Sequence, residues 1–277
     1  MNTSTQLDLV TEARARQRGI GAFNVVLLEH AEAIVEGAEN AALPVILQIS
    51  QNAAKYHGSF EPIAAASLAI AREARVPVIV HLDHAEDADL VRAAVELGVH
   101  SVMFDGSALP YDKNVATTRE VVEFCHAQGV WVEAELGEVG GKDGVHAPGA
   151  RTRPDEAAVF VAATGVDALA VAVGTSHAMT SRVATVDRVL IEQLAASAGV
   201  PLVLHGSSGL SDDELVAAVR AGMTKINIST HLNGLFTAAA REALNADETL
   251  VDPRRYISPA RSAVAVETER LLRLLAL

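Results

Sequence analysis

Short apolar runs rich in β-branched residues recur along the chain and alternate with longer stretches that have the spacing of amphipathic helices. Such runs, bounded by glycine, proline and polar residues, are typical of buried strands. Eight are present, at residues 20–25, 45–50, 78–83, 101–104, 130–135, 168–173, 202–205 and 225–228. They recur roughly every 20 to 40 residues, which is the spacing of βα units.

The segments between the runs carry helical signals at their starts and ends. Apolar residues at helical spacing predict helices over 29–41, 87–97 and 211–221. The last of these opens with Ser211 and has Glu214 three positions later, which is a capping-box pattern. Glycines at 98, 129, 165 and 222 stand just past predicted helices, where a left-handed C-cap favours glycine. The tail at 259–277 predicts one further helix.

Eight βα units without a break in composition predict a single domain over residues 1–277. The fold class is α/β, and we expect a closed (β/α)8 TIM barrel with an extra C-terminal helix. A doubly wound open sheet is the alternative. No Gly-x-Gly-x-x-Gly motif follows the first predicted strand, which weakens that alternative.

The composition and net charge of the chain limit the kinds of partner that it can bind. The chain has 277 residues, 50% of them hydrophobic but only 4% aromatic, so the core is built mainly of aliphatic side chains. The net charge of −13 argues against nonspecific nucleic-acid binding and against an anionic membrane surface. Cys125 is the only cysteine, and we expect it to be buried. No signal peptide or membrane-spanning run is evident, so we expect a cytoplasmic protein.

In a barrel, function lies at the carboxyl ends of the strands. There the chain places Asn24, Ser50, Asp83, His84, Asp105, Glu133, Glu135, His177, His205, Asn227, Ser229 and Thr230. Three histidines follow the third, sixth and seventh strands. Three imidazoles with an open fourth position are typical of catalytic zinc, which can act as a Lewis acid on a substrate oxygen. Asp83, beside His84, adds a proton-transfer group.

Two segments have the residue types of an anion-binding site. The stretch His205-Gly206-Ser207-Ser208-Gly209 follows the seventh strand, and Asn227-Ile228-Ser229-Thr230 ends the eighth. Small residues let backbone amides approach a ligand, and a helix N-terminus attracts phosphate. The loops after strands seven and eight are the recurring phosphate site of barrels, so the sequence predicts a phosphorylated substrate.

The chain resembles the class II, metal-dependent fructose- and tagatose-bisphosphate aldolases over about residues 21–261. The carriers are His-Leu-Asp-His at 81–84, Ser-Val-Met-Phe-Asp-Gly-Ser at 101–107, Val-Glu-Ala-Glu-Leu-Gly at 132–137 with glycines 140 and 141, Gly-Thr-Ser-His at 174–177, Leu-His-Gly at 204–206, Lys-Ile-Asn-Ile at 225–228 and Asp-Pro-Arg at 252–254. As a set they are highly specific.

The resemblance implies a homodimeric or homotetrameric glycolytic lyase that acts on small sugar phosphates. It implies that zinc is held by His84, His177 and His205, that Asp83 moves the proton of the C4 hydroxyl, and that Asp105 and Glu135 match positions linked to an alternative site for a second divalent ion. A monovalent cation, Na⁺ or K⁺, belongs near Gly174 and the phosphate loop.

For substrate binding, the resemblance implies a cradle for dihydroxyacetone phosphate at Gly206, Ser207, Ser208, Asn227, Ile228, Ser229 and Thr230. Asn24 and Ser50, with Asn227, are candidates to bind the ketose oxygens. Arg254 matches an arginine that reaches the second phosphate from a neighbouring subunit.

Three positions depart from the family pattern. Ala178 stands where a glycine amide normally meets the phosphate, and Ser207 replaces the second glycine of the loop after His205. The loop after Gly141 normally carries a glutamate that shuttles the C3 proton; here it reads Lys142-Asp143-Gly144, which makes Asp143 the candidate replacement.

Fructose 1,6-bisphosphate is the favoured substrate. The departures leave open a specialised paralogue acting on tagatose 1,6-bisphosphate or an inositol-catabolic phosphate, and a noncatalytic barrel that binds metal or sugar phosphate. A Schiff-base aldolase would need a lysine at a strand's carboxyl end. None of the four lysines, at 55, 113, 142 and 225, is well placed for that.

Overall fold

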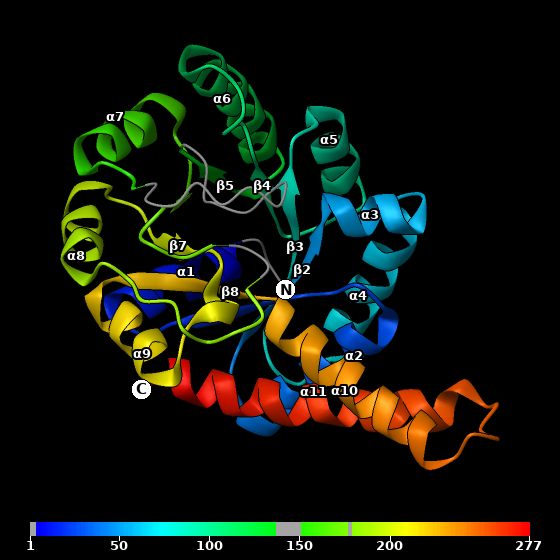
Figure 1. Cartoon of the computed structure of the whole chain (residues 1–277). Coiled ribbons are helices and arrows are strands. Elements are labelled where there is room, and N and C mark those ends of the chain that lie inside the picture. The colour runs from blue at the N-terminus through cyan, green and yellow to red at the C-terminus, as the bar shows by residue number, and fades with distance from the viewer. Residues whose placement is uncertain (1–3, 137–150, 177–178) are drawn as a thin grey trace.

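Eight parallel strands close into a barrel in the computed structural model, which describes residues 4–136, 151–176 and 179–277 (Figure 1). Each strand pairs with its neighbour in sequence, and β1 pairs with β8 to close the barrel. The strands are β1 (Ile20–Asn24), β2 (Val45–Ser50), β3 (Val78–Ala85), β4 (Ser101–Phe104), β5 (Trp131–Glu135), β6 (Ala168–Ala170), β7 (Leu202–Leu204) and β8 (Met223–Ile228). The predicted (β/α)8 barrel is confirmed, and the open-sheet alternative is wrong.

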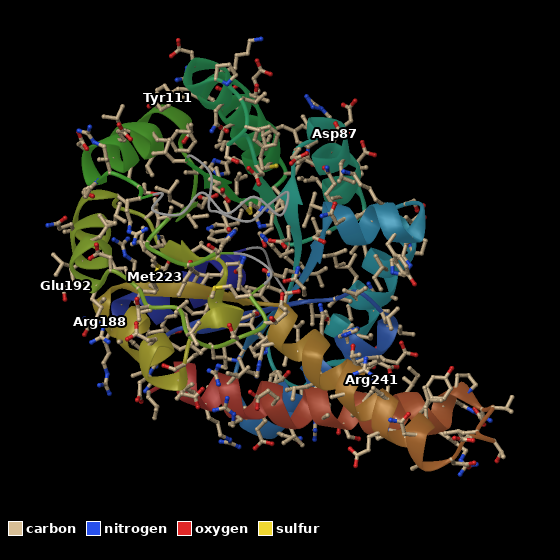
Figure 2. The ribbon with its side chains drawn as sticks, in the orientation of Figure 1. Asp87, Tyr111, Arg188, Glu192, Met223 and Arg241 are labelled. Atoms are coloured by element: carbon tan, nitrogen blue, oxygen red, sulfur yellow. The ribbon has the colours of Figure 1, made fainter. Side chains whose placement is uncertain are left out.

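Most of the helices surround the barrel in a ring, and α1 lies behind the strands (Figure 1). The helices are α1 (Ser4–Ala15), α2 (Leu28–Ala41), α3 (Gln51–His57), α4 (Glu61–Glu73), α5 (Ala88–Glu96), α6 (Tyr111–Ala127), α7 (Pro154–Thr164), α8 (Arg188–Ser197), a short 3₁₀ turn η1 (Ser207–Gly209), α9 (Asp212–Ala221), α10 (Thr230–Ala246) and α11 (Pro253–Leu275). Polar side chains of α8, such as Arg188 and Glu192, point away from the barrel (Figure 2). Among the described residues, no helix is both long and apolar enough to cross a membrane.

Local sequence signals place most elements correctly. Strands β2 and β4 have the predicted bounds. The Ser211 hydroxyl accepts a hydrogen bond from the Glu214 amide and so caps α9 as its sequence indicates. Gly98, Gly129, Gly165 and Gly222 all have positive φ, as expected after helices.

The predicted start of the C-terminal helix is wrong. Helix α11 begins at Pro253 rather than at residue 259, because Asp252 caps its first turn and Pro253 occupies a position where a missing amide costs nothing. Pro259 therefore lies inside the helix and removes one internal hydrogen bond. Packing of α11 against α2 and α10 offsets that loss.

The strands divide their side chains between two apolar clusters, as the period of two in a strand requires. Outward-facing residues such as Val80 and Val132 pack under the helices. Inward-facing residues such as Ile79 and Trp131 form a second cluster inside the barrel, where α1 contributes Val10. Toward the carboxyl ends of the strands the inward positions become polar, and the site is built there.

Candidate active site

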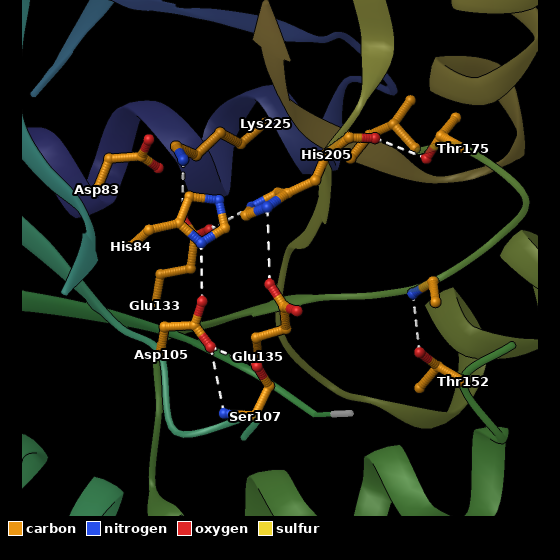
Figure 3. A network of polar contacts seen from close by, with 12 residues as sticks. Asp83, His84, Asp105, Ser107, Glu133, Glu135, Thr152, Thr175, His205 and Lys225 are labelled. Carbon is orange, nitrogen blue, oxygen red and sulfur yellow. Dashed lines mark hydrogen bonds and ion pairs between the residues drawn. The ribbon is translucent and has the colours of Figure 1, made fainter. Parts of the chain in front are cut away.

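A bulge in β3 brings two consecutive side chains to one site. Neighbouring strand residues normally point to opposite faces, yet Asp83 and His84 both face the mouth of the barrel (Figure 3). The pairing of β3 with β4 shifts between Leu82 and Ala85, and His84 has a left-handed φ of 49°. Such a conformation costs a non-glycine residue roughly 1–2 kcal/mol. The fold accepts this strain where it re-aims a functional residue.

Three donors converge on one point at the mouth of the barrel. His84 on β3, Glu135 at the end of β5 and His205 directly after β7 each offer a ligand atom within 4.8 Å of the others. The rings of His84 and His205 lie 4.7 Å apart and nearly perpendicular. His205 and Glu135 are fully buried. Imidazole and carboxylate are the donors that zinc and similar divalent ions take, so the set fits the predicted metal.

The charges around this set favour a cation. Burial alone lowers the pKa of His84, but Asp83, Asp105 and Glu135 outweigh it and raise that pKa to about 9. Burial raises the pKa of Asp83, but His84 and Lys225 outweigh it and bring that pKa below its ordinary value. Asp83 is therefore ionised at neutral pH. The same field that holds a proton on His84 attracts a divalent ion.

A chain of amides fixes the Asp83 carboxylate. The Asn24 side-chain nitrogen donates to Asp83 Oδ2 at 3.0 Å, and the Gln48 side-chain nitrogen donates to Asn24 Oδ1 at 2.7 Å. These residues come from β3, β1 and β2, and only 2% of Asp83 is exposed. Ser50, at the end of β2, caps α3 by accepting from the Ala53 amide at 3.1 Å.

Asp105 orients His84. Its Oδ2 lies 2.8 Å from His84 Nδ1, and its Oδ1 accepts from the Ser107 amide at 3.2 Å and hydroxyl at 2.6 Å (Figure 3). A carboxylate on one ring nitrogen of a histidine fixes the tautomer and raises the basicity of the other. Nε2 is then the nitrogen of His84 that would face a metal.

The two predicted phosphate loops lie side by side. Ser208 Oγ accepts from the amides of Ser229 at 3.3 Å and His231 at 3.2 Å, which joins η1 to the start of α10. Gly206 has a φ of 69°, and a Cβ there would lie 2.5 Å from the Ser176 carbonyl oxygen. A cleft of about 460 Å³ opens beside these loops and is lined in part by Ser208 and Thr230.

Of the three positions that depart from the family pattern, the structure describes only Ser207. Ser207 is buried, and its hydroxyl donates to the Leu204 carbonyl at 3.1 Å, so it points into the protein. His177, Ala178 and Asp143 lie outside the described residues.

Arg254 lies apart from the site. It stands at the start of α11, at the outer tip that α10 and α11 form (Figure 1), and pairs with Asp252 at 2.7 Å. Its side chain is 88% exposed. Arg254 therefore does not complete the site of its own chain.

A family model described as fructose-bisphosphate aldolase class-II matches residues 4–276. The chain belongs to this family. It is 39% identical over 287 residues to a fructose-bisphosphate aldolase of Thermus caldophilus, with 94% of this chain and 93% of the relative covered. It is 37% identical over 268 residues to a fructose-bisphosphate aldolase of Geobacillus stearothermophilus, with 95% and 93% covered.

Among solved structures, the chain is similar to the YdjI aldolase from Escherichia coli K12. The two are 32% identical with a TM-score of 0.84, and the match covers 97% of this chain and 95% of the other. Membership of the class II fructose-bisphosphate aldolase family, which the sequence motifs imply, is thus confirmed.

The ion pair beneath the metal donors is not predicted from the sequence. Glu133 is expected there as a strand-end residue and Lys225 as part of a family motif that is not placed for a Schiff base, yet both are fully buried and form an ion pair at 2.9 Å. His81 joins them, with Nδ1 2.8 Å from Ser101 Oγ. Burial, with Lys225 nearby, holds the pKa of His81 well below its usual range, so this ring is neutral. The spacing of Glu133 and Glu135 by two in one strand is the signal that both face inward.

Proposed function

We propose that this class II aldolase reversibly cleaves fructose 1,6-bisphosphate into dihydroxyacetone phosphate and glyceraldehyde 3-phosphate. The observation that carries the proposal is the convergence of His84, Glu135 and His205 beside the buried, ionised Asp83. A carbon–carbon cleavage of this kind needs a group that accepts negative charge on the ketose oxygen and a base for the hydroxyl next to the broken bond.

Zinc is the proposed metal. His84 and His205 would hold it together with His177, the third histidine that the resemblance to the family implies, and Glu135 would offer a further donor. When bound, the ion would supply Lewis-acid polarisation of the substrate's carbonyl oxygen. Asp105 would keep His84 oriented, and it is a candidate ligand of a second divalent ion. A Na⁺ or K⁺ ion is proposed near Gly174.

Asp83 is the proposed base in the cleavage direction. It takes the proton from the C4 hydroxyl, and it returns the proton to the aldehyde oxygen in the synthetic direction. The Asn24 amide holds the carboxylate at 3.0 Å, which fixes the direction of proton transfer. Asn24, Ser50 and Asn227 are proposed to bind the ketose oxygens. Asp143 is proposed to move the C3 proton of dihydroxyacetone phosphate.

The substrate's phosphates have two proposed sites. The loops at 206–208 and 227–230, with Ala178, are proposed to bind the phosphate of dihydroxyacetone phosphate, where backbone amides and the N-terminus of α10 favour an anion. Arg254 is proposed to reach the second phosphate in a neighbouring subunit of a homodimer or homotetramer. Its 88% exposure at an outer tip supports a role in trans. We place the enzyme in the cytoplasm.

A substrate panel on zinc-loaded protein tests the proposal. We expect triose phosphate to form from fructose 1,6-bisphosphate, to stop on addition of a chelator and to return with zinc. Faster cleavage of tagatose 1,6-bisphosphate or another ketose phosphate would reassign the substrate. Binding of zinc without cleavage of any ketose phosphate would instead indicate a noncatalytic barrel.

Asp143 has a separate test. Hydrogen exchange at C3 of dihydroxyacetone phosphate measures the proton transfer that is proposed for this residue. The Asp143→Ala variant is expected to lose the exchange by about 10²–10⁴-fold, the usual contribution of an acid–base group. Unchanged exchange in the variant would remove Asp143 from the mechanism.

A further inference from the structure

A buried charged pair lies directly beneath His205. Glu133 Oε1 is 3.1 Å from His205 Nε2, and Glu133 Oε2 is 2.9 Å from Lys225 Nζ (Figure 3). All three side chains have an exposed fraction of 0%. Glu133 comes from β5 and Lys225 from β8, so the pair spans the interior of the barrel rather than two neighbouring strands.

Stability does not account for this pair. Removing two charges from water costs several kcal/mol per ion, and apolar residues of similar size at such positions are often as stable or more stable. The inward positions just below this layer are in fact apolar, including Ile79 and Trp131. A charged pair one layer above these apolar residues therefore points to a role in the site that it adjoins.

The contact selects one form of His205. A neutral imidazole carries its proton on one nitrogen and presents a lone pair on the other. With Glu133 accepting from Nε2, the lone pair is on Nδ1, which lies 3.7 Å from Glu135 Oε2, on the side of the metal donors. The opposite tautomer would set a lone pair against the carboxylate.

Glu133 itself is held from two further sides. Lys225 contacts its Oε2, and His81 Nε2 lies 3.8 Å from the same oxygen. His81 is in turn fixed by Ser101. The carboxylate thus has little freedom to turn away from His205.

We propose that Glu133 is a positioning residue that sets the tautomer and direction of His205 for metal binding, with Lys225 as the counter-ion that holds the Glu133 carboxylate in place. The inference rests on the proposed function, in which His205 is a metal ligand. Neither Glu133 nor Lys225 is assigned a contact with substrate.

The test replaces the pair in two ways. In Glu133→Leu with Lys225→Met, no acceptor remains for His205 and no charge remains unpaired. In Glu133→Gln with Lys225→Met, the amide oxygen still accepts from Nε2. The matched control is Glu32→Leu with Arg261→Met, which removes an ion pair of 2.7 Å between α2 and α11, away from the site.

The measurement is the dissociation constant for Co²⁺, determined by competition with a chelator. Each protein is first shown to be folded without metal by a cooperative thermal melting transition. The Leu/Met variant is expected to bind Co²⁺ 10–100-fold more weakly, the usual loss when a partner of a ligating histidine is removed. The Gln/Met variant and the control are expected to stay within a few-fold of the unmodified protein. A folded Leu/Met variant that binds as tightly as the unmodified protein would overturn the proposal.

A second measurement uses only the unmodified protein, so it does not depend on whether a variant folds. The ¹⁵N shifts of the His205 ring in the metal-free, unmodified protein are expected to show the Nε2-protonated tautomer, and an Nδ1-protonated ring would refute the inference. Failure of the proposed function is distinguishable, because it is measured by the cleavage of ketose phosphates by the unmodified protein, whereas the two measurements here follow Co²⁺ binding and the His205 ring.

Discussion

Replacing Asp83 by Asn separates proton transfer from metal binding. In the unmodified protein the Asn24 side-chain nitrogen donates to Asp83 Oδ2 at 3.0 Å. Asparagine at position 83 keeps the size of the side chain and an oxygen that can accept this hydrogen bond. Only the charge and the ability to take a proton are lost. The hydrogen bond becomes neutral, so the expected loss in the free energy of unfolding is about 1 kcal/mol, and the variant is expected to fold.

The effect on catalysis is expected to be much larger. A positioned acid–base group contributes about 10²–10⁴-fold in rate, and each factor of ten corresponds to about 1.4 kcal/mol of barrier. Asp83 is only 2% exposed, so bulk water has poor access to the position and cannot readily replace it as a base. We therefore expect the upper half of that range, a loss of about 10³–10⁴-fold or about 4–5.5 kcal/mol.

The assay is cleavage of fructose 1,6-bisphosphate at saturating zinc, with zinc content measured on the same sample. Exchange of the C3 proton of dihydroxyacetone phosphate is expected to survive, because that step has no C4 hydroxyl. Asp213→Asn, an exposed change in the first turn of α9, is the control for the loss of one carboxylate and is expected to cleave at the normal rate. Cleavage by a zinc-loaded Asp83→Asn protein within tenfold of normal would refute the role of Asp83 as the base.

Three further predictions concern stability. Gly206→Ala is expected to lower the free energy of unfolding in urea by roughly 1–3 kcal/mol more than Gly58→Ala, since both have positive φ but only the first would press a Cβ against the Ser176 backbone; equal losses would show that no clash occurs. His100 accepts from the Val80 amide at 2.8 Å, and burial lowers its pKa to about 4. The stability that neutral His100 contributes is fully present above pH 6.5, the ordinary pKa of histidine, and is lost as the pH falls toward 4. Lowering the pH from 7 to 5 is therefore expected to reduce the free energy of unfolding by about 2 kcal/mol through this group. His100→Asn is expected to lack that part of the pH dependence, and identical slopes for both proteins would contradict it. Chelation of the metal is expected to lower the melting temperature by several degrees, because a ligand at a hundred times its dissociation constant stabilises by about 2.7 kcal/mol; an unchanged melting temperature would mean that no ion was bound.

The sequence predicts the barrel well because the signals of a strand and a helix are local. The runs at 45–50 and 101–104 are buried strands over the predicted residues. The third strand also places Asp83 and His84 at the carboxyl end that barrels use for chemistry. For the C-terminal helix the local signal is ambiguous, because proline is compatible with a first turn at both 253 and 259. The Asp252 cap favours the earlier start, and packing of the buried face of α11 offsets the hydrogen bond that Pro259 removes.

What the sequence by itself determined is the order of the elements, the family and the residue types at the strand ends. Only the tertiary structure decided how those residues face one another. The bulge that turns Asp83 and His84 to the same side depends on how β3 pairs with β4. The contact of Glu133 with Lys225 depends on barrel closure, which brings the inward sides of β5 and β8 within reach. Burial then gives these contacts their effect, since a low-dielectric interior strengthens a charge interaction that water would screen.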